Sequence, residues 1–152
     1  MAPQGVRNLL IDIKKMVINK KSWQLTHHSR AKPKIPDSIK NILQEKADYI
    51  VVNTLKPRHI KPPPNDIDFN YLSDIHIKWY RNYLYFCATY SFHDSNANIS
   101  SFEMRFARME YIDIDSFSIS YWRHTEEWFE VYHKLPMLEC LKLIIEEPQF
   151  MP

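Results

Sequence analysis

Hydrophobic and polar residues alternate over much of the region between residues 69 and 132. Ile75, Ile77 and Trp79, for example, are each followed by a polar residue or by tyrosine. A period of two residues is typical of a strand with one buried face. Of the 21 aromatic residues in the chain, 18 lie between Phe69 and Tyr132, and aromatic side chains fit a pleated, half-buried surface. The region therefore predicts a twisted antiparallel sheet.

Turn-forming segments divide this region into five short strands. The predicted connections are Arg81–Asn82, His93–Ser101, Asp113–Ser116 and Thr125–Glu127. Consecutive strands joined by short connections favour a meander. The alternation slips at Phe106–Arg108, which predicts a β-bulge in the third strand.

Two segments with a helical period flank the predicted sheet. The first begins at Pro36 and runs to about Leu55, and the second begins at Pro136 and ends at Pro148. After the first helix, Lys56–Asp66 (KPRHIKPPPND) contains three consecutive prolines, which favour polyproline II and argue against a helix. The predicted fold class is α+β, a five-stranded antiparallel β-meander packed by two main helices and preceded by a basic N-terminal amphipathic helix or arm.

The first 34 residues differ in charge from the rest of the chain. Residues 1–34 contain eight Lys or Arg and one Asp, a net charge of +7, whereas residues 35–152 have a net charge of −5. Apolar residues at spacings of three and four predict a helix over about residues 5–18, followed by a linker. We therefore divide the chain into a basic N-terminal arm, residues 1–34, and a single α+β domain, residues 35–152.

Three roles are compatible with the basic arm. It can contact an anionic partner such as nucleic acid, fold back on its own domain, or remain a solvated appendage. The candidate binding residues in the arm are Lys14, Lys15, Lys20, Lys21, Trp23, Arg30, Lys32 and Lys34.

Composition excludes several classes of function. The single glycine, Gly5, leaves no Walker A loop, no dinucleotide-binding fingerprint and no nucleophile elbow. No apolar run approaches the ~20 residues that a membrane-spanning helix needs. Charged residues near the N-terminus argue against a signal peptide, so we expect a cytoplasmic location by default. We expect Cys87 and Cys140 to be buried, reduced thiols.

The sequence contains no metal-binding or catalytic motif. We expect no cofactor, no metal site and no catalytic residue; the least weak metal-binding trio is His76, His124 and a nearby carboxylate. The densest polar cluster is His124, Glu126 and Glu127. It is compatible with acid–base chemistry, and equally with a charged hairpin that keeps a sheet edge soluble.

The predicted sheet offers a candidate binding surface. Tyr83, Tyr85, Arg105 and Arg123 are candidate contacts for nucleic acid or another partner, with Lys78 and Trp122 as neighbours. Aromatic groups interleaved with cations stack bases and neutralise phosphates on sheet platforms. Against this hypothesis, glutamates occur on the same strands, and cation–aromatic pairs commonly stabilise neighbouring strands.

Several segments resemble an uncharacterised family of small bacterial conserved-hypothetical proteins. They are LKPRHIKPPP, KWYRNYLYFCATY, FARMEYIDIDSFSISYWRHTEEWFEVY and LPMLECLKLIIEEPQF. The resemblance covers about residues 35–152 and implies one compact sheet-and-helix unit. It implies no activity, because that family supplies no catalytic or binding residues to carry over.

Three functions remain after these exclusions. The first is a non-enzymatic binding module or accessory subunit that engages a larger protein or nucleoprotein partner. The second is a nucleic-acid-binding protein that uses the basic arm and the aromatic and arginine residues of the sheet. The third is a small metal-dependent hydrolase or nuclease. The sequence does not indicate an oligomeric state.

Overall fold

A single antiparallel sheet forms the centre of the structure, a computed structural model that describes residues 32–65, 68–96 and 98–152. Its strands follow the chain in the order β1-β2-β3-β4-β5, which confirms the predicted meander and the α+β fold class. The strands are β1 (Tyr71–Tyr80), β2 (Tyr83–His93), β3 (Ile99–Asp113), β4 (Ser116–Trp122) and β5 (Trp128–Leu135). The helix predicted over residues 5–18 lies outside the described residues.

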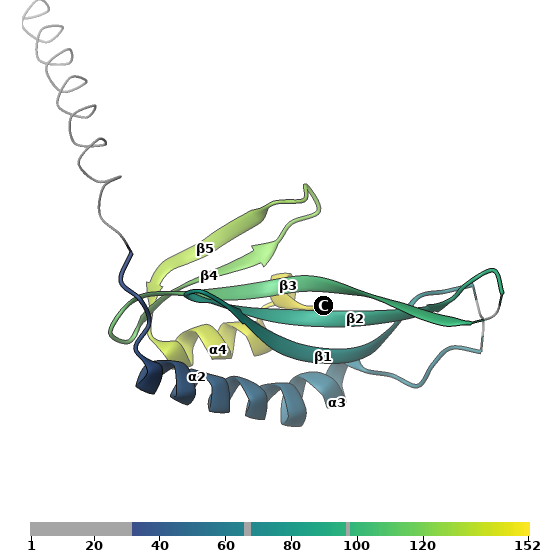
Figure 1. Cartoon of the computed structure of the whole chain (residues 1–152), viewed down its shortest axis with the longest axis horizontal. Coiled ribbons are helices and arrows are strands. Elements are labelled where there is room, and N and C mark those ends of the chain that lie inside the picture. Colours follow the sequence, from purple (N-terminus) through teal and green to yellow (C-terminus); the bar gives the residue numbers. More distant parts are fainter. Residues whose placement is uncertain (1–31, 66–67, 97) are drawn as a thin grey trace, which may run out of the picture. The chain divides into compact units, whose positions relative to one another are not determined.

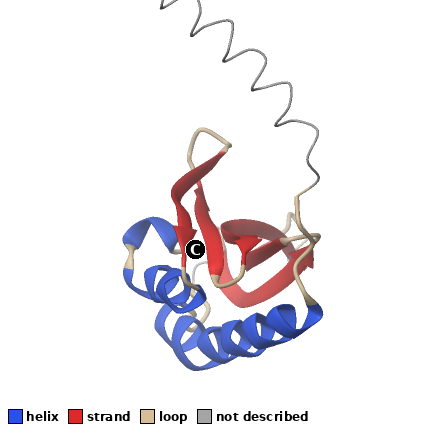
Figure 2. Ribbon diagram, turned by 90° about the vertical axis from the view of Figure 1, so that its left-hand side faces the viewer, coloured by secondary structure: helices blue, strands red, loops and turns tan. Residues whose placement is uncertain are grey.

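The helices lie on one face of the sheet (Figures 1 and 2). They are α2 (Asp37–Ile50), the π-helical turn η1 (Val51–Leu55), α3 (Lys56–His59), α4 (Met137–Glu146) and the 3-10 turn η2 (Pro148–Phe150). The two main helices, α2 and α4, begin directly after Pro36 and Pro136, as predicted. At each N-terminus the carbonyl of the proline accepts the first helical hydrogen bond.

The prediction that no helix includes Lys56–Asp66 is wrong for its first four residues. These residues form α3, which continues directly from η1 and contains Pro57. A proline in a helix donates no hydrogen bond, and its ring crowds the carbonyl four residues earlier. That carbonyl belongs to Asn53, which lies in the wider π-helical turn. The local change in helix geometry lets the chain continue past Pro57 to His59.

The hydrophobic core lies between the sheet and the helices. Most elements contribute side chains with almost no exposed surface, including Leu43 of α2, Ile75 of β1, Phe86 of β2, Ile119 of β4 and Ile144 of α4. The C-terminal turn η2 adds Phe150, whose ring meets the Tyr121 ring edge-on at 6.0 Å between centroids. Cys87 and Cys140 are buried, free thiols, as predicted.

Three of the turns contain a non-glycine residue with positive φ. These residues are Arg81 (51°), Asp115 (45°) and Glu126 (62°). Because the chain has a single glycine, Asn82, Asp113 and Asp115 are the candidates for positive φ that the sequence offers, and of these Asp115 adopts it. Asp115 also accepts a 3.0 Å hydrogen bond from the backbone N–H of Met137 through Oδ1. The turn between β3 and β4 thereby caps the N-terminus of α4.

The sheet is irregular and strongly bent. In the pairing of β2 with β3, Cys87 lies opposite Arg105 and Phe86 opposite Ala107, so Phe106 is the extra residue of a bulge. This confirms the predicted bulge. The β4–β5 hairpin rises on the side of the sheet away from the helices (Figure 1). The Trp128 ring of β5 consequently comes within 5.7 Å of the Tyr85 ring of β2, centroid to centroid.

Residues Pro33–Pro152 form one compact unit. Its first residues are held by Asn82, whose side-chain oxygen accepts a hydrogen bond from the Ile35 N–H, while its amide nitrogen donates to the Pro33 carbonyl. None of the helices in the described residues has the length and apolar character needed to cross a membrane.

Candidate functional site

A cluster of arginine and aromatic side chains occupies the sheet face opposite the helices. It draws on four neighbouring strands, β2 to β5, and we call it the arginine–aromatic face. Its members are Tyr83, Tyr85, Arg105, Arg108, Trp122 and Trp128.

The bulge at Phe106 places both arginines on this face. Residues three apart point to opposite faces of a regular strand, because side chains alternate. In β3, however, Arg105 pairs with Cys87 and Arg108 pairs with Tyr85, and these two β2 residues share one face. The extra residue therefore restores Arg108 to the side of Arg105.

Both guanidinium groups lie over aromatic rings. The Arg105 guanidinium carbon is 4.4 Å from the centroid of the Tyr85 ring. The Arg108 guanidinium carbon is 4.8 Å from the Tyr83 ring and 4.6 Å from the Trp128 ring. Such contacts are worth about 0.5–2 kcal/mol each. They hold the charged groups in defined positions on the sheet.

Neither arginine forms an ion pair with a carboxylate among the residues that the structure describes. In addition, Nε of Arg108 is buried and has no hydrogen-bond partner there. Guanidinium N–H groups are strong donors, and an unsatisfied buried donor costs about 1–3 kcal/mol. The arginine–aromatic face thus offers two ordered cations that no carboxylate of the described residues neutralises.

A pocket of about 460 Å³ adjoins Arg105. Trp122 and Trp128 form an aromatic wall, with their rings edge-on and 5.3 Å apart. The other lining residues are Glu103, Met104 and Arg105. A ligand in this pocket would meet the apolar tryptophan wall, the Arg105 cation and the Glu103 carboxylate.

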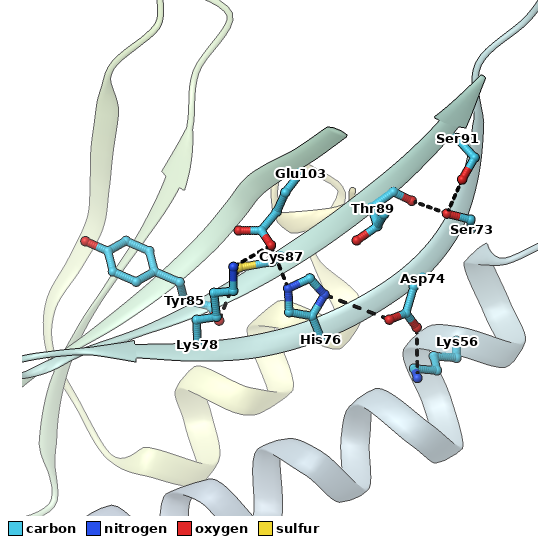
Figure 3. Close-up of polar contacts among 10 residues, drawn as sticks. All are labelled: Lys56, Ser73, Asp74, His76, Lys78, Tyr85, Cys87, Thr89, Ser91 and Glu103. Carbon is cyan, nitrogen blue, oxygen red and sulfur yellow. Dashed lines mark hydrogen bonds and ion pairs between the residues drawn. The ribbon is translucent and has the colours of Figure 1, made fainter. Parts of the chain in front are cut away.

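A polar cluster formed by residues of β1, β3 and α3 borders this pocket at Glu103 (Figure 3). Oε2 of Glu103 lies 2.7 Å from Nζ of Lys78 and 2.9 Å from Nε2 of His76. On the other side of the imidazole, Nδ1 lies 4.0 Å from Oδ2 of Asp74, and Asp74 forms a 2.9 Å ion pair with Lys56. The hydrogen bond from Lys78 lowers the pKa of Glu103, so this side chain is a carboxylate.

Cys87 lies beneath the polar cluster and has no exposed surface. Burial raises the pKa of its thiol to about 11. The thiol is therefore protonated near neutral pH and is a poor nucleophile. Its sulfur, one nitrogen of His76 and one oxygen of Glu103 all lie within 4.8 Å of one another. These three residues could hold a metal ion. From the sequence we expected no metal site, and the least weak trio there was His76, His124 and a carboxylate.

The structure brings together only some of the binding residues predicted from the sequence. Tyr83, Tyr85 and Arg105 lie in the arginine–aromatic face, but Arg123 does not. The Arg123 guanidinium carbon lies 4.7 Å from the Phe129 ring, and Phe129 and Trp128 are adjacent residues of β5 that point to opposite faces.

The predicted residues of the arm fall mostly outside the described part of the chain. Lys14, Lys15, Lys20, Lys21, Trp23 and Arg30 are not described, and Lys32 and Lys34 are exposed. Within the sheet, the sequence analysis missed Arg108 and Trp128. The slip of the alternation at Phe106–Arg108 was the available signal for Arg108.

The polar cluster at His124, Glu126 and Glu127 lies in the turn between β4 and β5. All three side chains are exposed. None of the three lines the pocket beside Arg105. Their position is that of charged residues at the tip of a hairpin.

A second hollow, of about 570 Å³, lies between α2 and α4. Its apolar lining includes Ile42, Tyr49 and Leu138, all of which are exposed. Glu45, Lys46, Lys142 and Glu146 surround it, so the charges at its rim are balanced. This groove resembles a protein contact surface and shows no preference for a ligand of either charge.

The fold and the sheet face define an α+β protein with a candidate anion-binding surface. Over residues 35–152 the chain matches the model of the family described as Domain of unknown function (DUF3024), and the chain belongs to that family. The predicted membership of an uncharacterised domain family is thereby confirmed. No curated protein and no solved structure matches the chain.

Proposed function

We propose that the protein is a non-enzymatic binding module, an accessory subunit whose arginine–aromatic face binds an acidic segment of a partner protein. The observation that carries this proposal is the pair of arginines, Arg105 and Arg108. Both are ordered by aromatic rings, and neither has a carboxylate partner in the described residues.

The chemistry of these arginines favours a carboxylate ligand. Guanidinium groups bind carboxylates through two parallel hydrogen bonds, and stacking on aromatic rings fixes their planes before the ligand arrives. Less side-chain entropy is then lost on binding. A carboxylate that reached Nε of Arg108 would also satisfy the buried donor that has no partner.

The neighbouring pocket favours a peptide over an isolated anion. Trp122 and Trp128 present an indole wall beside Arg105, and tryptophan and arginine are the residue types that dominate binding energy at protein interfaces. An aromatic or aliphatic side chain next to the acidic residue would fill the pocket. The net charge of −5 over residues 35–152 opposes any anionic ligand, and it disfavours a long polyanion on this domain more strongly than a short acidic segment.

The test is a fluorescence-anisotropy titration of the full chain with two labelled peptide pools. One pool carries a glutamate next to tryptophan or leucine, and the other has glutamine in its place. A charge-assisted hydrogen bond contributes about 1.5–3 kcal/mol, so we expect the glutamate pool to bind at least about tenfold more tightly. The double variant Arg105→Gln, Arg108→Gln should lose this preference.

The matched control is Arg123→Gln. Arg123 also stacks on an aromatic ring, Phe129, but outside the arginine–aromatic face. The Arg123→Gln variant should bind the glutamate pool as tightly as the wild type does. Circular dichroism should show that all variants fold. Equal binding of the two pools, or equal losses in the double variant and the control, would contradict the proposal.

Nucleic-acid binding is the second candidate, because aromatic rings and guanidinium planes also stack bases. The net charge of +7 on residues 1–34 adds a cation source that the peptide proposal does not need. The same titration with single-stranded RNA and DNA over a salt series separates the two. Binding that weakens steeply with salt and requires residues 1–34 would favour nucleic acid.

A further inference from the structure

The cluster of His76, Cys87 and Glu103 contains the donor types of a transition-metal site. We propose that these three residues bind Zn²⁺. This site goes beyond the proposed function, because it uses an imidazole nitrogen, a carboxylate oxygen and the Cys87 sulfur and neither of the two arginines. The sulfur binds as a thiolate, so the S–H bond breaks as the Zn–S bond forms and the proton is released to solvent. Mixed nitrogen, sulfur and oxygen donors suit Zn²⁺, whereas Mg²⁺ and Ca²⁺ prefer oxygen ligands.

The sheet register brings the three ligands together from three adjacent strands. His76 of β1 lies directly opposite Cys87 of β2. Glu103 of β3 pairs with Thr89, two residues further along β2 than Cys87 and on the same face. Figure 3 shows His76 and Glu103 reaching toward each other near the Cys87 sulfur. Sites built on paired strands hold their ligands more rigidly than sites on loops.

The distances between the donor atoms are compatible with tetrahedral coordination. Zn–N and Zn–S bonds of about 2.1 and 2.3 Å place neighbouring donors about 3.4–3.6 Å apart. Nε2 of His76 and Oε2 of Glu103 are already 2.9 Å apart, and no pair of donors in the trio exceeds 4.8 Å. Small side-chain rotations therefore suffice. Three protein ligands leave a fourth position for water or for a carboxylate of a bound partner.

A metal-binding histidine usually donates the N–H of its other ring nitrogen to a carboxylate, and His76 has a carboxylate on that side, although at 4.0 Å it lies beyond hydrogen-bond distance. Nδ1 faces Oδ2 of Asp74 at 4.0 Å, and Lys56 holds that carboxylate through Oδ1 at 2.9 Å. A carboxylate on the far side of an imidazole favours a proton on Nδ1 and leaves the lone pair of Nε2 for the metal. Asp74 is therefore a positioning residue for the site.

Lys78 competes with a metal ion for Glu103. Its ammonium group lies 2.7 Å from Oε2, the same oxygen that contacts His76. Metal binding requires this ammonium group to turn away, and its side chain is half exposed and free to do so. Removal of the charge in Lys78→Met should therefore tighten Zn²⁺ binding, an effect that a purely structural hydrogen-bond cluster does not predict.

The experiment measures Co²⁺ and Zn²⁺ binding to the full chain after chelator treatment. Co²⁺ should produce a thiolate-to-metal charge-transfer absorption, and Zn²⁺ should displace it. Cys87→Ser should abolish the band. Glu103→Gln and Asp74→Asn should weaken Zn²⁺ binding about tenfold or more, and Lys78→Met should strengthen it about fivefold, the usual upper size of an exposed ion pair.

Matched controls are available within the chain. His133 and Glu130 form a histidine–carboxylate pair at 3.2 Å that belongs to no group of three potential metal ligands among the described residues. His133→Gln should therefore leave the Zn²⁺ affinity unchanged. Cys140→Ser controls for loss of a buried thiol, and His27→Gln with His28→Gln removes the histidine pair of the arm. A charge-transfer band that persists in Cys87→Ser, or equal Zn²⁺ affinities in wild type, Glu103→Gln and Lys78→Met, would overturn the proposal. If Cys87→Ser fails to fold, the Zn²⁺ affinities of Glu103→Gln and Lys78→Met, both at exposed positions, test the proposal.

Discussion

Asp115 has two separable effects on stability, and substitutions at this one position can distinguish them. Its backbone has a positive φ of 45°, which glycine and asparagine tolerate better than alanine does. Its Oδ1 accepts a 3.0 Å hydrogen bond from the N–H of Met137 and caps α4. Alanine removes the cap and keeps the strained backbone, glycine removes both the cap and the strain, and asparagine retains an acceptor.

The structure gives the order and the approximate size of these changes. Loss of a helix cap costs about 1 kcal/mol, and alanine at positive φ costs about 1 kcal/mol more than a tolerant residue. Asp115→Ala should therefore lower the free energy of unfolding by about 2 kcal/mol. Asp115→Gly should lower it by less than about 1 kcal/mol, because relief of backbone strain offsets part of the lost cap. Asp115→Asn should stay within about 0.5 kcal/mol of the wild type.

Urea unfolding at 25 °C, followed by circular dichroism, measures these differences. Ile114 provides the control, since it lies in the same turn, is 78% exposed and caps no helix; Ile114→Ala should change stability by less than about 0.5 kcal/mol. The reasoning fails if Asp115→Ala is as stable as Asp115→Asn. It also fails if Asp115→Gly is less stable than Asp115→Ala.

Two further predictions concern the core. Phe150 has no exposed surface, so Phe150→Ala should cost about 3–5 kcal/mol in urea unfolding, whereas Phe69→Ala, at a position 63% exposed, should cost little. For Cys140, burial raises the thiol pKa from 9.0 to about 12; the unfolded chain loses this proton first, so stability should fall as pH rises above 9.0. Between pH 9.0 and about 12, Cys140 alone should lower the free energy of unfolding by up to about 1.4 kcal/mol per pH unit. Cys140→Ala should lack this part of the pH dependence. Identical pH slopes in wild type and variant would contradict this assignment.

Much of the fold could be predicted because the local and tertiary signals agree. The strands are rich in aromatic residues and alternate in polarity, and the meander needs only short connections. The errors fall where the tertiary structure overrides a local preference. Pro57 suppresses helix in isolation, but a π-helical turn admits it. Arg81 and Glu126 adopt positive φ because the strands on either side impose the turn.

The candidate metal ligands could not be grouped from the sequence for a different reason. His76, Cys87 and Glu103 lie on three strands, and only the pairing register decides which of their side chains meet. The sequence placed Cys87 in a strand as a buried thiol, which is correct, but it gave no account of what lies above the sulfur. His124, which the sequence analysis named with His76 in the least weak metal-binding trio, lies in the exposed β4–β5 turn, and His76 lies instead beside Cys87 and Glu103.

The bulge at Phe106 is a feature of the fold that also determines the candidate site. Strict alternation through β3 assigns Arg105 and Arg108 to opposite faces, so a pattern-based analysis selects Arg105 and omits Arg108. The extra residue reverses the alternation and, together with the bent β4–β5 hairpin, places Arg108 between Tyr83 and Trp128. Phe106 itself is buried beside Phe86, so the core stabilises the irregularity. A break in the polar–apolar pattern thus helps to locate the candidate site, because it marks where a sheet collects on one face the residues that a regular strand would separate.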